Sequence, residues 1–544
     1  MDDSFHVYDT TLRDGAQREG ISYSVADKLA IAPLLDEFGV GFIEGGWPGA
    51  MPKDTEFFAR ARDELALRHA QLVAFGSTRR PGVDVATDPQ VAALLDSGAP
   101  VITLVAKSDV RHVEQALRTT REENLAMVAD TVAHLVGNGR RVFIDCEHFF
   151  DGYLADSDYG VAVLEAAAEA GADVGVLCDT NGGTLPIQLA GIVAQVSART
   201  GLRIGIHCQD DTACAVANTL VAVEAGATHV QCTANGYGER TGNADLFAVV
   251  ASLQLKQKRQ VLPPGCLEEM VRVSHAIAEI ANIRPNTHQA YVGTSAFAHK
   301  AGLHASAIKV SPQLYNHMEP AAVGNGMRIL VTEMAGRASV ELKSRELGLD
   351  LTDHPEAIGA LVEIVKTREA QGWSYEAADA SFELLARKEL DTVLGNITPT
   401  PFTLESYRVS VEHHTDARIV SEATVKLRVA GERVMATAEG NGPVNALDHA
   451  LRTALVRHFP EVSLLEMSDY KVRILEGTNG TDAVTRVLID TSNGQRGWTT
   501  VGVHGNVIEA SWSALLDALA YGLLHEATGV TQAGTRAPAG VPVG

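Results

Sequence analysis

The stretch FHVYDTTLRDGAQ, residues 5–17, opens with a short apolar run and ends on an arginine, a carboxylate and a glycine before its last two residues. The run predicts a buried strand, and Gly15 predicts the turn that ends it. Arg13 and Asp14 would then stand side by side at the carboxyl end of the strand. A cationic fork beside a hard oxygen ligand suits a keto acid bound to a divalent cation, and a surface ion pair next to a turn is the alternative.

Similar apolar runs recur along the first half of the chain, each followed by a segment with helical spacing of apolar residues. The eight runs cover residues 5–9, 40–46, 72–77, 101–106, 142–147, 174–179, 204–208 and 228–232. Strands that alternate with helices over about 250 residues predict a (β/α)8 TIM barrel, an α/β fold whose functional groups lie at the carboxyl ends of the strands. A doubly wound sheet also alternates strands and helices, but it would not bring eight strand ends to one mouth.

The residues at the carboxyl ends of these runs are polar and varied. In the predicted barrel they would meet at one mouth, which is where such barrels carry their active sites. His207 and Gln209 lie two residues apart on one strand, so both side chains leave the same face. The whole set consists of Arg13 with Asp14, Glu44, Lys107, Glu147, Thr180, His207 with Gln209, and the loop at residues 235–243.

Composition limits the class of protein. The 544 residues carry a formal charge of −23 and are 46% hydrophobic and 21% charged, which is typical of a globular protein of several domains. The acidic balance argues against binding nucleic acid along an extended surface. The acidic N-terminus and the lack of a run of about 18 apolar residues argue against a secretory signal or a membrane span, so we expect a cytoplasmic protein. The six cysteines form no CxxC pair, so no zinc–cysteine site is expected.

The remainder of the chain changes character. Helical spacing predominates at residues 267–281, 355–368 and 376–387, and two prolines and a glycine at residues 394–401 mark a boundary. Alternating runs at 402–411, 421–429 and 434–438 follow, and then a helix after Pro443. We therefore expect a TIM barrel over residues 1–260, a helical linker subdomain over 261–394, an α+β domain over 395–528 and a disordered tail over 529–544.

Three motifs resemble those of one enzyme family, the acyl-CoA–condensing synthases that include isopropylmalate, homocitrate and citramalate synthases. Residues 9–17 resemble the opening motif of this family, which pyruvate-binding aldolases, lyases and carboxyltransferases share. The glycine loop at residues 234–243 matches the family's version almost residue for residue, and residues 440–445, GNGPVN, resemble its end-product–binding module. The resemblance runs over nearly the whole chain, and it implies a TIM barrel followed by a regulatory domain.

The resemblance implies a metal site at the barrel mouth. It places Asp14, His207 and Asn243 around a divalent cation, and Gln209 stands where the family has the second histidine of a His-x-His pair. An amide oxygen is a harder and weaker donor than imidazole, so we expect Gln209 as the fourth ligand and Mg²⁺ or Mn²⁺ rather than Zn²⁺. Two alternatives stay open: Asp210 replaces the missing imidazole, or the metal has been lost.

The resemblance also implies the catalytic groups. Arg13 would bind the substrate and stabilise the alkoxide that forms, and Thr180 would donate a hydrogen bond to the substrate carboxylate. Glu147, among aromatic neighbours that would make its carboxylate a usable base, or His304 would remove a proton. In the family the equivalents of His304 and Tyr315 lie on a segment that covers the active site of the partner subunit. We therefore expect a homodimer.

The substrate follows from the second predicted strand. Residues 43–49, IEGGWPG, resemble the citramalate synthases, and a bulky Trp47 near the mouth favours pyruvate over a branched keto acid. Acetyl-CoA would be the cosubstrate of a metal-dependent Claisen condensation that gives citramalate and CoA. The end-product module implies feedback by isoleucine or leucine bound between two chains, as expected for a committed biosynthetic step.

Three alternatives remain. The same chemistry on 2-ketoisovalerate or 2-ketoglutarate would make the protein a 2-isopropylmalate or homocitrate synthase, because one methyl group discriminates by only about 10- to 200-fold. A keto-acid aldolase or lyase is the second alternative, although residues 234–243 lack the reactive cysteine that lyase relatives carry there. The third is a non-catalytic amino-acid–sensing dimer, which the missing second imidazole would explain.

Overall fold

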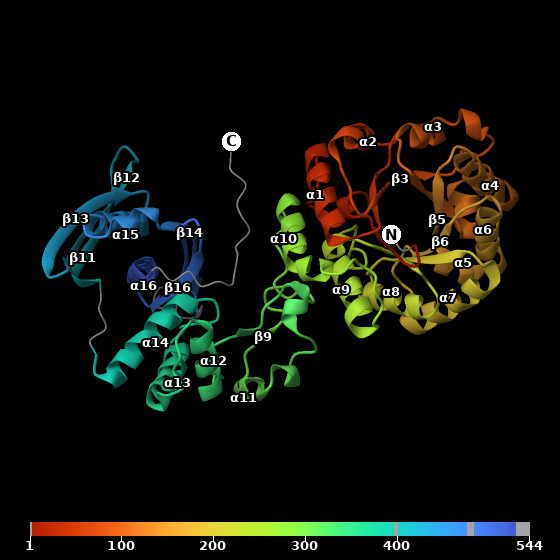
Figure 1. Ribbon diagram of the computed structural model, residues 1–544. Helices are drawn as coiled ribbons and strands as arrows, with labels where there is room; N and C mark the ends of the chain where they lie inside the picture. Colours follow the sequence, from red (N-terminus) through yellow and green to blue (C-terminus); the bar gives the residue numbers. More distant parts are fainter. Residues whose placement is uncertain (1–2, 397–400, 476–482, 529–544) are drawn as a thin grey trace. The chain divides into compact units, whose positions relative to one another are not determined.

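The structure is a computed structural model that describes residues 3–396, 401–475 and 483–528 (Figure 1). The tail expected over residues 529–544 lies outside the described residues, as does part of the boundary expected at residues 394–401. Contacts divide the chain into two compact units, Met1–Phe297 with Met318–Gly326 and Ala298–His317 with Met327–Gly544. The domain boundaries expected at residues 260 and 394 stay predictions.

The first unit is built on a closed barrel of eight parallel strands that follow one another in sequence order. Each strand agrees within two residues with one of the apolar runs that predicted it. The predicted TIM barrel is therefore confirmed. The strands are β1 (His6–Asp9), β2 (Phe42–Gly46), β3 (Gln71–Ser77), β4 (Val101–Lys107), β5 (Arg141–Glu147), β6 (Val174–Asp179), β7 (Arg203–Cys208) and β8 (His229–Cys232).

Helices surround the barrel and alternate with its strands (Figure 1). Helix α1 begins with a capping box, in which the Ser24 hydroxyl accepts from the Asp27 N–H and the Asp27 carboxylate accepts from the Ser24 N–H, and it ends at Gly39 with a φ of 90°. The helices are α1 (Val25–Phe38), α2 (Pro52–Glu64), α3 (Pro89–Asp96), α4 (Arg121–Gly137), α5 (Phe149–Ala155), α6 (Ser157–Glu169), α7 (Pro186–Thr200), α8 (Ala215–Glu224), α9 (Leu246–Ala251) and α10 (Met270–Ile280).

The barrel wall separates two apolar cores. Phe42 and Phe143 are buried inside the barrel, whereas the next residues along their strands, Ile43 and Ile144, are buried between the strands and the helices. Successive side chains of a strand point to opposite faces, so every strand supplies both cores. The runs therefore read as continuously apolar, and a polar residue among them lies inside the protein.

The first strand is shorter than its motif suggests. β1 ends at Asp9, whose carboxylate accepts hydrogen bonds from the N–H and the hydroxyl of Thr11 and turns the chain. The Thr10 carbonyl then accepts from the N–H groups of Arg13 and Gly15, at 3.2 and 3.0 Å. The expectation that Arg13 and Asp14 end the strand is wrong in detail, because they lie in the turn that follows it.

The second unit holds two antiparallel three-stranded sheets and the helices between and around them. The helices and strands expected at residues 355–368, 376–387, 402–411, 421–429 and 434–438 are all present. The elements are β9 (Ala298–His299), α11 (Gly302–Val310), β10 (Arg328–Ile329), α12 (Arg337–Glu346), α13 (Pro355–Ala370), α14 (Asp379–Leu394), β11 (Phe402–His413), β12 (Ile419–Val429), β13 (Glu432–Gly440), α15 (Pro443–Leu455), β14 (Glu466–Ile474), β15 (Thr485–Ser492), β16 (Gly497–His504) and α16 (Val507–Thr528).

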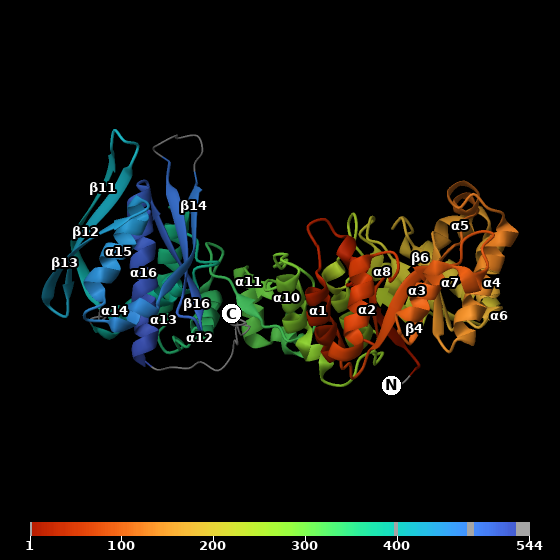
Figure 2. The ribbon, with the colours of Figure 1, turned by 90° about the horizontal axis from the view of Figure 1, so that it is seen from above.

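Helix α16 is the one described helix that is long and apolar enough to cross a membrane, over Val507–His525. It packs against β15, β16 and α15 (Figure 2). Its side chains Trp512, Leu515 and Leu519 are buried in the core of this unit. Glu509 and Asp517 interrupt its apolar run. These contacts make α16 a core helix.

Candidate functional site

The four predicted metal ligands lie together at the mouth of the barrel. Asp14 follows β1, His207 lies next to the last residue of β7, and Gln209 pairs through its backbone with Asn243 of the glycine loop after β8. His207 Nε2 lies 3.6 Å from Asp14 Oδ2, and Gln209 Nε2 lies 3.3 Å from the same oxygen. All four residues are at most 7% exposed. The structure therefore brings together four side chains that the sequence spreads over more than two hundred residues.

Two oxygens of this cluster are buried without a hydrogen-bond partner, namely Gln209 Oε1 and Asn243 Oδ1. Buried polar atoms in native proteins almost always have partners, so each orphan needs an explanation. A hard cation that takes carboxylate, amide and imidazole donors supplies one. Within residues 3–396, 401–475 and 483–528, no three His, Cys, Asp or Glu side chains could hold a metal, so such a site needs the amide oxygens.

Asp210, the alternative to Gln209, is turned toward helix α8. Its carboxylate accepts a hydrogen bond from the Ala215 N–H at 2.9 Å. Its own backbone N–H donates to the Gly242 carbonyl and fixes this part of the β7 loop. Gln209, rather than Asp210, is therefore the side chain that contacts Asp14.

Arg13 is held as a cation beside the ligand cluster. Its Nε donates to Glu44 Oε2 at 2.6 Å, and its Nη1 donates to Asp14 Oδ1 at 2.9 Å. Burial opposes the charged form, but the two carboxylates outweigh burial and raise the pKa of Arg13. Burial would likewise raise the pKa of Asp14, yet the charge of the neighbouring Arg13 guanidinium opposes burial and the pKa is lowered. Both groups are charged at neutral pH.

Glu44 holds Arg13 in this position, and the sequence analysis placed it only among the polar residues at strand ends. It is fully buried at β2, where the Tyr8 hydroxyl donates to Oε1 at 2.5 Å and the Thr10 hydroxyl donates to Oε2. Tyr8, Thr10 and Arg13 are thus three donors that together satisfy both carboxylate oxygens of Glu44. The signal in the sequence was a lone acid inside an apolar run.

The wall beside Arg13 is aromatic. The Arg13 guanidinium carbon lies 3.9 Å from the centre of the Phe75 ring, and the Trp47 ring meets Phe75 edge to face at 5.3 Å. The indole N–H of Trp47 is buried without a hydrogen-bond partner. Trp47 therefore lies near the predicted substrate arginine, with one donor unused.

Glu147 and Thr180 lie at the carboxyl ends of β5 and β6. Glu147 forms an ion pair with Lys107 across from it on β4. The aromatic surroundings expected for Glu147 are wrong, because the side chains of Phe149 and Phe150 are buried in the core and a cation neighbours the carboxylate instead. Thr180 Oγ accepts from the His148 N–H at 2.9 Å, which leaves its own O–H free to donate to a substrate.

His304 and Tyr315 belong to the second unit. Their rings stack with 4.1 Å between the centres, and the His299 ring lies 6.3 Å from His304. Ser306, two residues after His304, donates to the Gly302 carbonyl in its own helix. The two predicted residues thus form one aromatic pair, and their approach to the barrel mouth stays a prediction.

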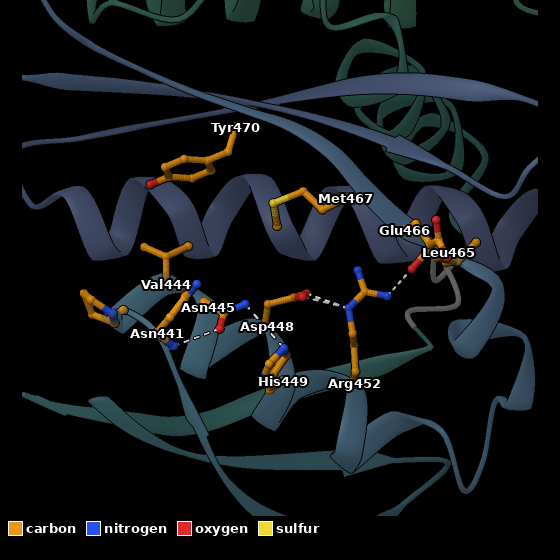
Figure 3. A pocket seen from close by; sticks show the side chains of 12 residues that line it. Asn441, Val444, Asn445, Asp448, His449, Arg452, Leu465, Glu466, Met467 and Tyr470 are labelled. Carbon is orange, nitrogen blue, oxygen red and sulfur yellow. Dashed lines mark hydrogen bonds and ion pairs between the residues drawn. The ribbon is translucent and has the colours of Figure 1, made fainter. Parts of the chain in front are cut away.

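A cavity lies in the second unit, between the start of α15 and β14 (Figure 3). It measures about 680 Å³ and includes most of the predicted end-product motif, residues 441–445. Asp448 and Arg452 form an ion pair at 2.8 Å on one side, and Val444, Met467 and Tyr470 supply apolar surface. The cavity therefore offers both charges and an apolar side to one small ligand.

Family models match the chain in three consecutive segments. A model described as HMGL-like matches residues 4–278, and one described as homocitrate synthase post-HMGL domain-like matches residues 291–372. A model described as LeuA allosteric (dimerisation) domain matches residues 376–523. The last segment contains the cavity beside α15.

Curated relatives match over nearly the whole chain. An (R)-citramalate synthase of Streptomyces coelicolor is 67% identical, over 96% of this chain and 98% of the relative. An (R)-citramalate synthase of Synechocystis sp. is 48% identical, over 97% and 98%. A 2-isopropylmalate synthase of Methanocaldococcus jannaschii is 28% identical, over 95% and 94%. The similarity to these two citramalate synthases is much greater than to this isopropylmalate synthase.

Proposed function

The chain belongs to the (R)-citramalate synthase family of condensing acyltransferases, and we propose that it joins pyruvate, acetyl-CoA and water to give citramalate and CoA. One observation carries the proposal. Asp14, His207, Gln209 and Asn243 converge beside a buried, charged Arg13, with two amide oxygens left without partners. This arrangement suits a keto acid whose carbonyl oxygen becomes negative during the reaction.

Asp14, His207, Gln209 and Asn243 would hold one divalent cation. The four side chains present hard oxygen donors and one imidazole and lack thiolates, which favours Mg²⁺ or Mn²⁺ over Zn²⁺. When bound, such a cation polarises the keto group of the substrate. The orphaned oxygens of Gln209 and Asn243 support this assignment, because nothing else in the described structure satisfies them.

The chain's own side chains then account for the chemistry. Glu147 or His304 removes a proton from the methyl group of acetyl-CoA, and that carbon bonds to the keto carbon of pyruvate. Arg13 faces the oxygen that gains negative charge, and Thr180 donates to the substrate carboxylate. Water then cleaves the thioester, which releases CoA as a free thiol and leaves a second carboxylate. The ion pair with Lys107 holds the Glu147 carboxylate in place at the carboxyl end of β5.

The preference for pyruvate would come from the Trp47–Phe75 wall. Phe75 supports Arg13 from one side, so a keto acid bound to Arg13 would meet this wall. A larger keto acid needs space that two aromatic rings occupy. Each extra methyl group on the keto acid should then lower kcat/KM by about 10- to 200-fold.

The cavity beside α15 would bind the regulatory amino acid. An amino acid carries both charges, and the Asp448–Arg452 pair lies beside apolar Val444 and Met467. The match to a LeuA allosteric (dimerisation) domain supports feedback by isoleucine or leucine and a homodimer. The compartment expected for such a biosynthetic enzyme is the cytoplasm.

Thiol release from acetyl-CoA tests the function. We expect thiol release with pyruvate, at least about 10-fold less with 2-ketoisovalerate or 2-ketoglutarate, and inhibition by isoleucine or leucine. Faster release with 2-ketoisovalerate or 2-ketoglutarate would make the protein a 2-isopropylmalate or homocitrate synthase instead. Cleavage of a 3-hydroxyacyl thioester without response to amino acids would indicate a lyase. Amino-acid binding without any thiol release would indicate a sensing dimer.

A further inference from the structure

Behind His207, two hydrogen bonds run through the interior of the barrel. His207 Nδ1 lies 2.9 Å from Gln231 Oε1, and Gln231 Nε2 donates to Asp145 Oδ1 at 2.9 Å. Gln231 is on β8 and Asp145 on β5, strands that β6 and β7 separate, so the second bond crosses the barrel. Gln231 is 1% exposed and Asp145 is 4% exposed. Neither residue was singled out for a role from the sequence.

The order of donors along this path is fixed by chemistry. An ionised carboxylate only accepts hydrogen bonds, so above the raised pKa of Asp145, about 8, this side chain holds the amide of Gln231 with its N–H₂ toward β5. The amide oxygen then faces His207 and accepts the proton on Nδ1. A neutral imidazole carries one N–H, so Nε2 of His207 is left with a lone pair.

The state of Nε2 decides whether the ligand cluster can open to a cation. Nε2 lies 3.6 Å from Asp14 Oδ2 and 3.5 Å from the amide of Gln209. A proton on Nε2 would point at the Asp14 carboxylate, and the two groups would pair with each other. A lone pair there repels the carboxylate oxygen and leaves room for a positive ion between them.

We propose that Asp145 and Gln231 are positioning residues that hold His207 as its Nδ1–H tautomer and so keep Nε2 available as a ligand. The inference rests on the proposed function, because it takes His207 to be one of the cation ligands. It assigns a use to a buried carboxylate and a buried amide that the condensation itself does not employ.

A purely structural role is the competing explanation, since a hydrogen bond across the barrel could simply brace β5 against β8. The two roles predict different losses. A brace would contribute to the free energy of unfolding without changing cation affinity. A positioning pair would contribute to cation affinity, by about 10- to 100-fold for residues that orient a metal ligand.

Calorimetric titration with Mn²⁺ separates the two. It should be run at about pH 8.5, because burial and the Glu44 carboxylate raise the pKa of Asp145 to about 8, against the opposing charge of Arg13. Gln231→Met keeps the side-chain volume and removes both bonds, and we expect it to bind Mn²⁺ about 10- to 100-fold more weakly. Gln231→Glu keeps an acceptor for His207 Nδ1–H and should recover most of the affinity.

Asn218→Leu is the matched control. Asn218 is a fully buried amide on α8 that donates to the Thr184 carbonyl, outside the ligand cluster. The variant Asn218→Leu should lower the unfolding temperature, as Gln231→Met does, but it should leave the affinity for Mn²⁺ unchanged. If Gln231→Met does not fold, Asp145→Asn tests the same path, because an amide no longer fixes the orientation of Gln231. We then expect a several-fold loss of affinity.

The outcomes separate this inference from the function. Wild-type affinity for Mn²⁺ in Gln231→Met, or in Asp145→Asn where only that variant folds, would overturn the positioning role while thiol release by the wild-type protein still supports the condensation. A wild-type protein that neither binds Mn²⁺ nor releases thiol would overturn the proposed function itself. Weaker binding in Gln231→Met together with recovery in Gln231→Glu would support the tautomer assignment.

Discussion

The two ends of the barrel both bury histidines, and they use them differently. At the mouth, His207 lies beside Asp14 and Gln209, and the amide oxygens of Gln209 and Asn243 lack partners. At the opposite end, His6 and His229 contact each other through Nδ1 at 3.2 Å, and His6 lies beside Asp3 and Arg141. Arg203 also contacts His6, so two guanidinium groups there would repel a cation. The neighbours of an imidazole, rather than the imidazole, decide whether it can be a ligand.

Electrostatics adds to the contrast. Burial lowers the pKa of His6 to about 4 and that of His229 well below its ordinary value, so this end packs as neutral rings against Phe42 and Phe143. The mouth instead keeps Arg13 and Asp14 charged. In barrels of this kind the carboxyl ends of the strands carry function and the other end carries stability.

The largest expected effect comes from removing charge at the mouth. Asp14→Asn keeps the shape of the side chain and removes the negative charge that would hold the cation. We expect kcat/KM for thiol release with pyruvate to fall by about 10³-fold or more, as for other losses of a group that stabilises charge in the transition state. Near-native turnover in this variant would contradict the assignment of the site.

The second largest effect is expected on metal preference, when the amide ligand Gln209 is replaced by an imidazole. Gln209→His supplies the softer imidazole in place of an amide, and we expect Zn²⁺ affinity to rise by about 10- to 100-fold relative to Mg²⁺. Competition calorimetry with the three ions measures this ratio. Tight Zn²⁺ binding by the wild-type protein, equal to that of the variant, would refute the role given to Gln209.

A smaller effect concerns Asp145, the acid buried in the barrel interior behind His207, because burial of its charge lowers the stability of the fold. The folded-state pKa of Asp145 is raised to about 8, above the ordinary value of 3.8, so the native state keeps its proton longer than the unfolded chain. Its contribution to stability therefore falls as pH rises from about 4 to about 8. Asp145→Asn removes this slope, and it should become more stable than wild type by about 1–2 kcal/mol at pH 8 and not at pH 4. Urea unfolding at the two pH values measures the difference, and a pH-independent difference would contradict it.

The smallest effect on turnover is expected at the other end. His229→Phe replaces a neutral buried ring whose Nε2 has no hydrogen-bond partner, and kcat/KM should stay within about two-fold of wild type. The depressed pKa of His229 means that wild type loses stability as pH falls below about 6.5, because the unfolded chain binds the proton first. His229→Phe should therefore lose less stability than wild type over the same fall in pH. A large drop in turnover would break the contrast between the two ends.

Much of the fold could be predicted from the sequence, because a barrel strand buried on both faces reads as one continuous apolar run. The motif similarity also pointed to the four side chains that lie together at the mouth. The sequence placed Arg13 and Asp14 at the end of β1, and they lie in the turn beyond it because the Asp9 side chain hydrogen-bonds to Thr11 and ends the strand earlier. A side-chain hydrogen bond of this kind does not change the spacing of apolar residues, so the sequence pattern does not show where the strand ends.

The supporting residues were harder to predict. Asp145 and Gln231 lie eighty-six positions apart and meet only because the barrel closes. Lys107 and Glu147 meet because β4 and β5 pair in register, which no single strand reveals. A polar residue inside an apolar run indicates an interior role, but its partner lies on another strand, and partners across a barrel are a property of the closed fold alone.

The central claim is that one cation at the mouth binds the keto acid, and Mn²⁺ paramagnetic resonance tests it most directly. We predict one bound Mn²⁺ per chain, a change in its spectrum when pyruvate is added, and the loss of both signals in Asp14→Asn. Pyruvate binding of equal strength in the presence of a chelator, or an unaltered Mn²⁺ spectrum in Asp14→Asn, would contradict it.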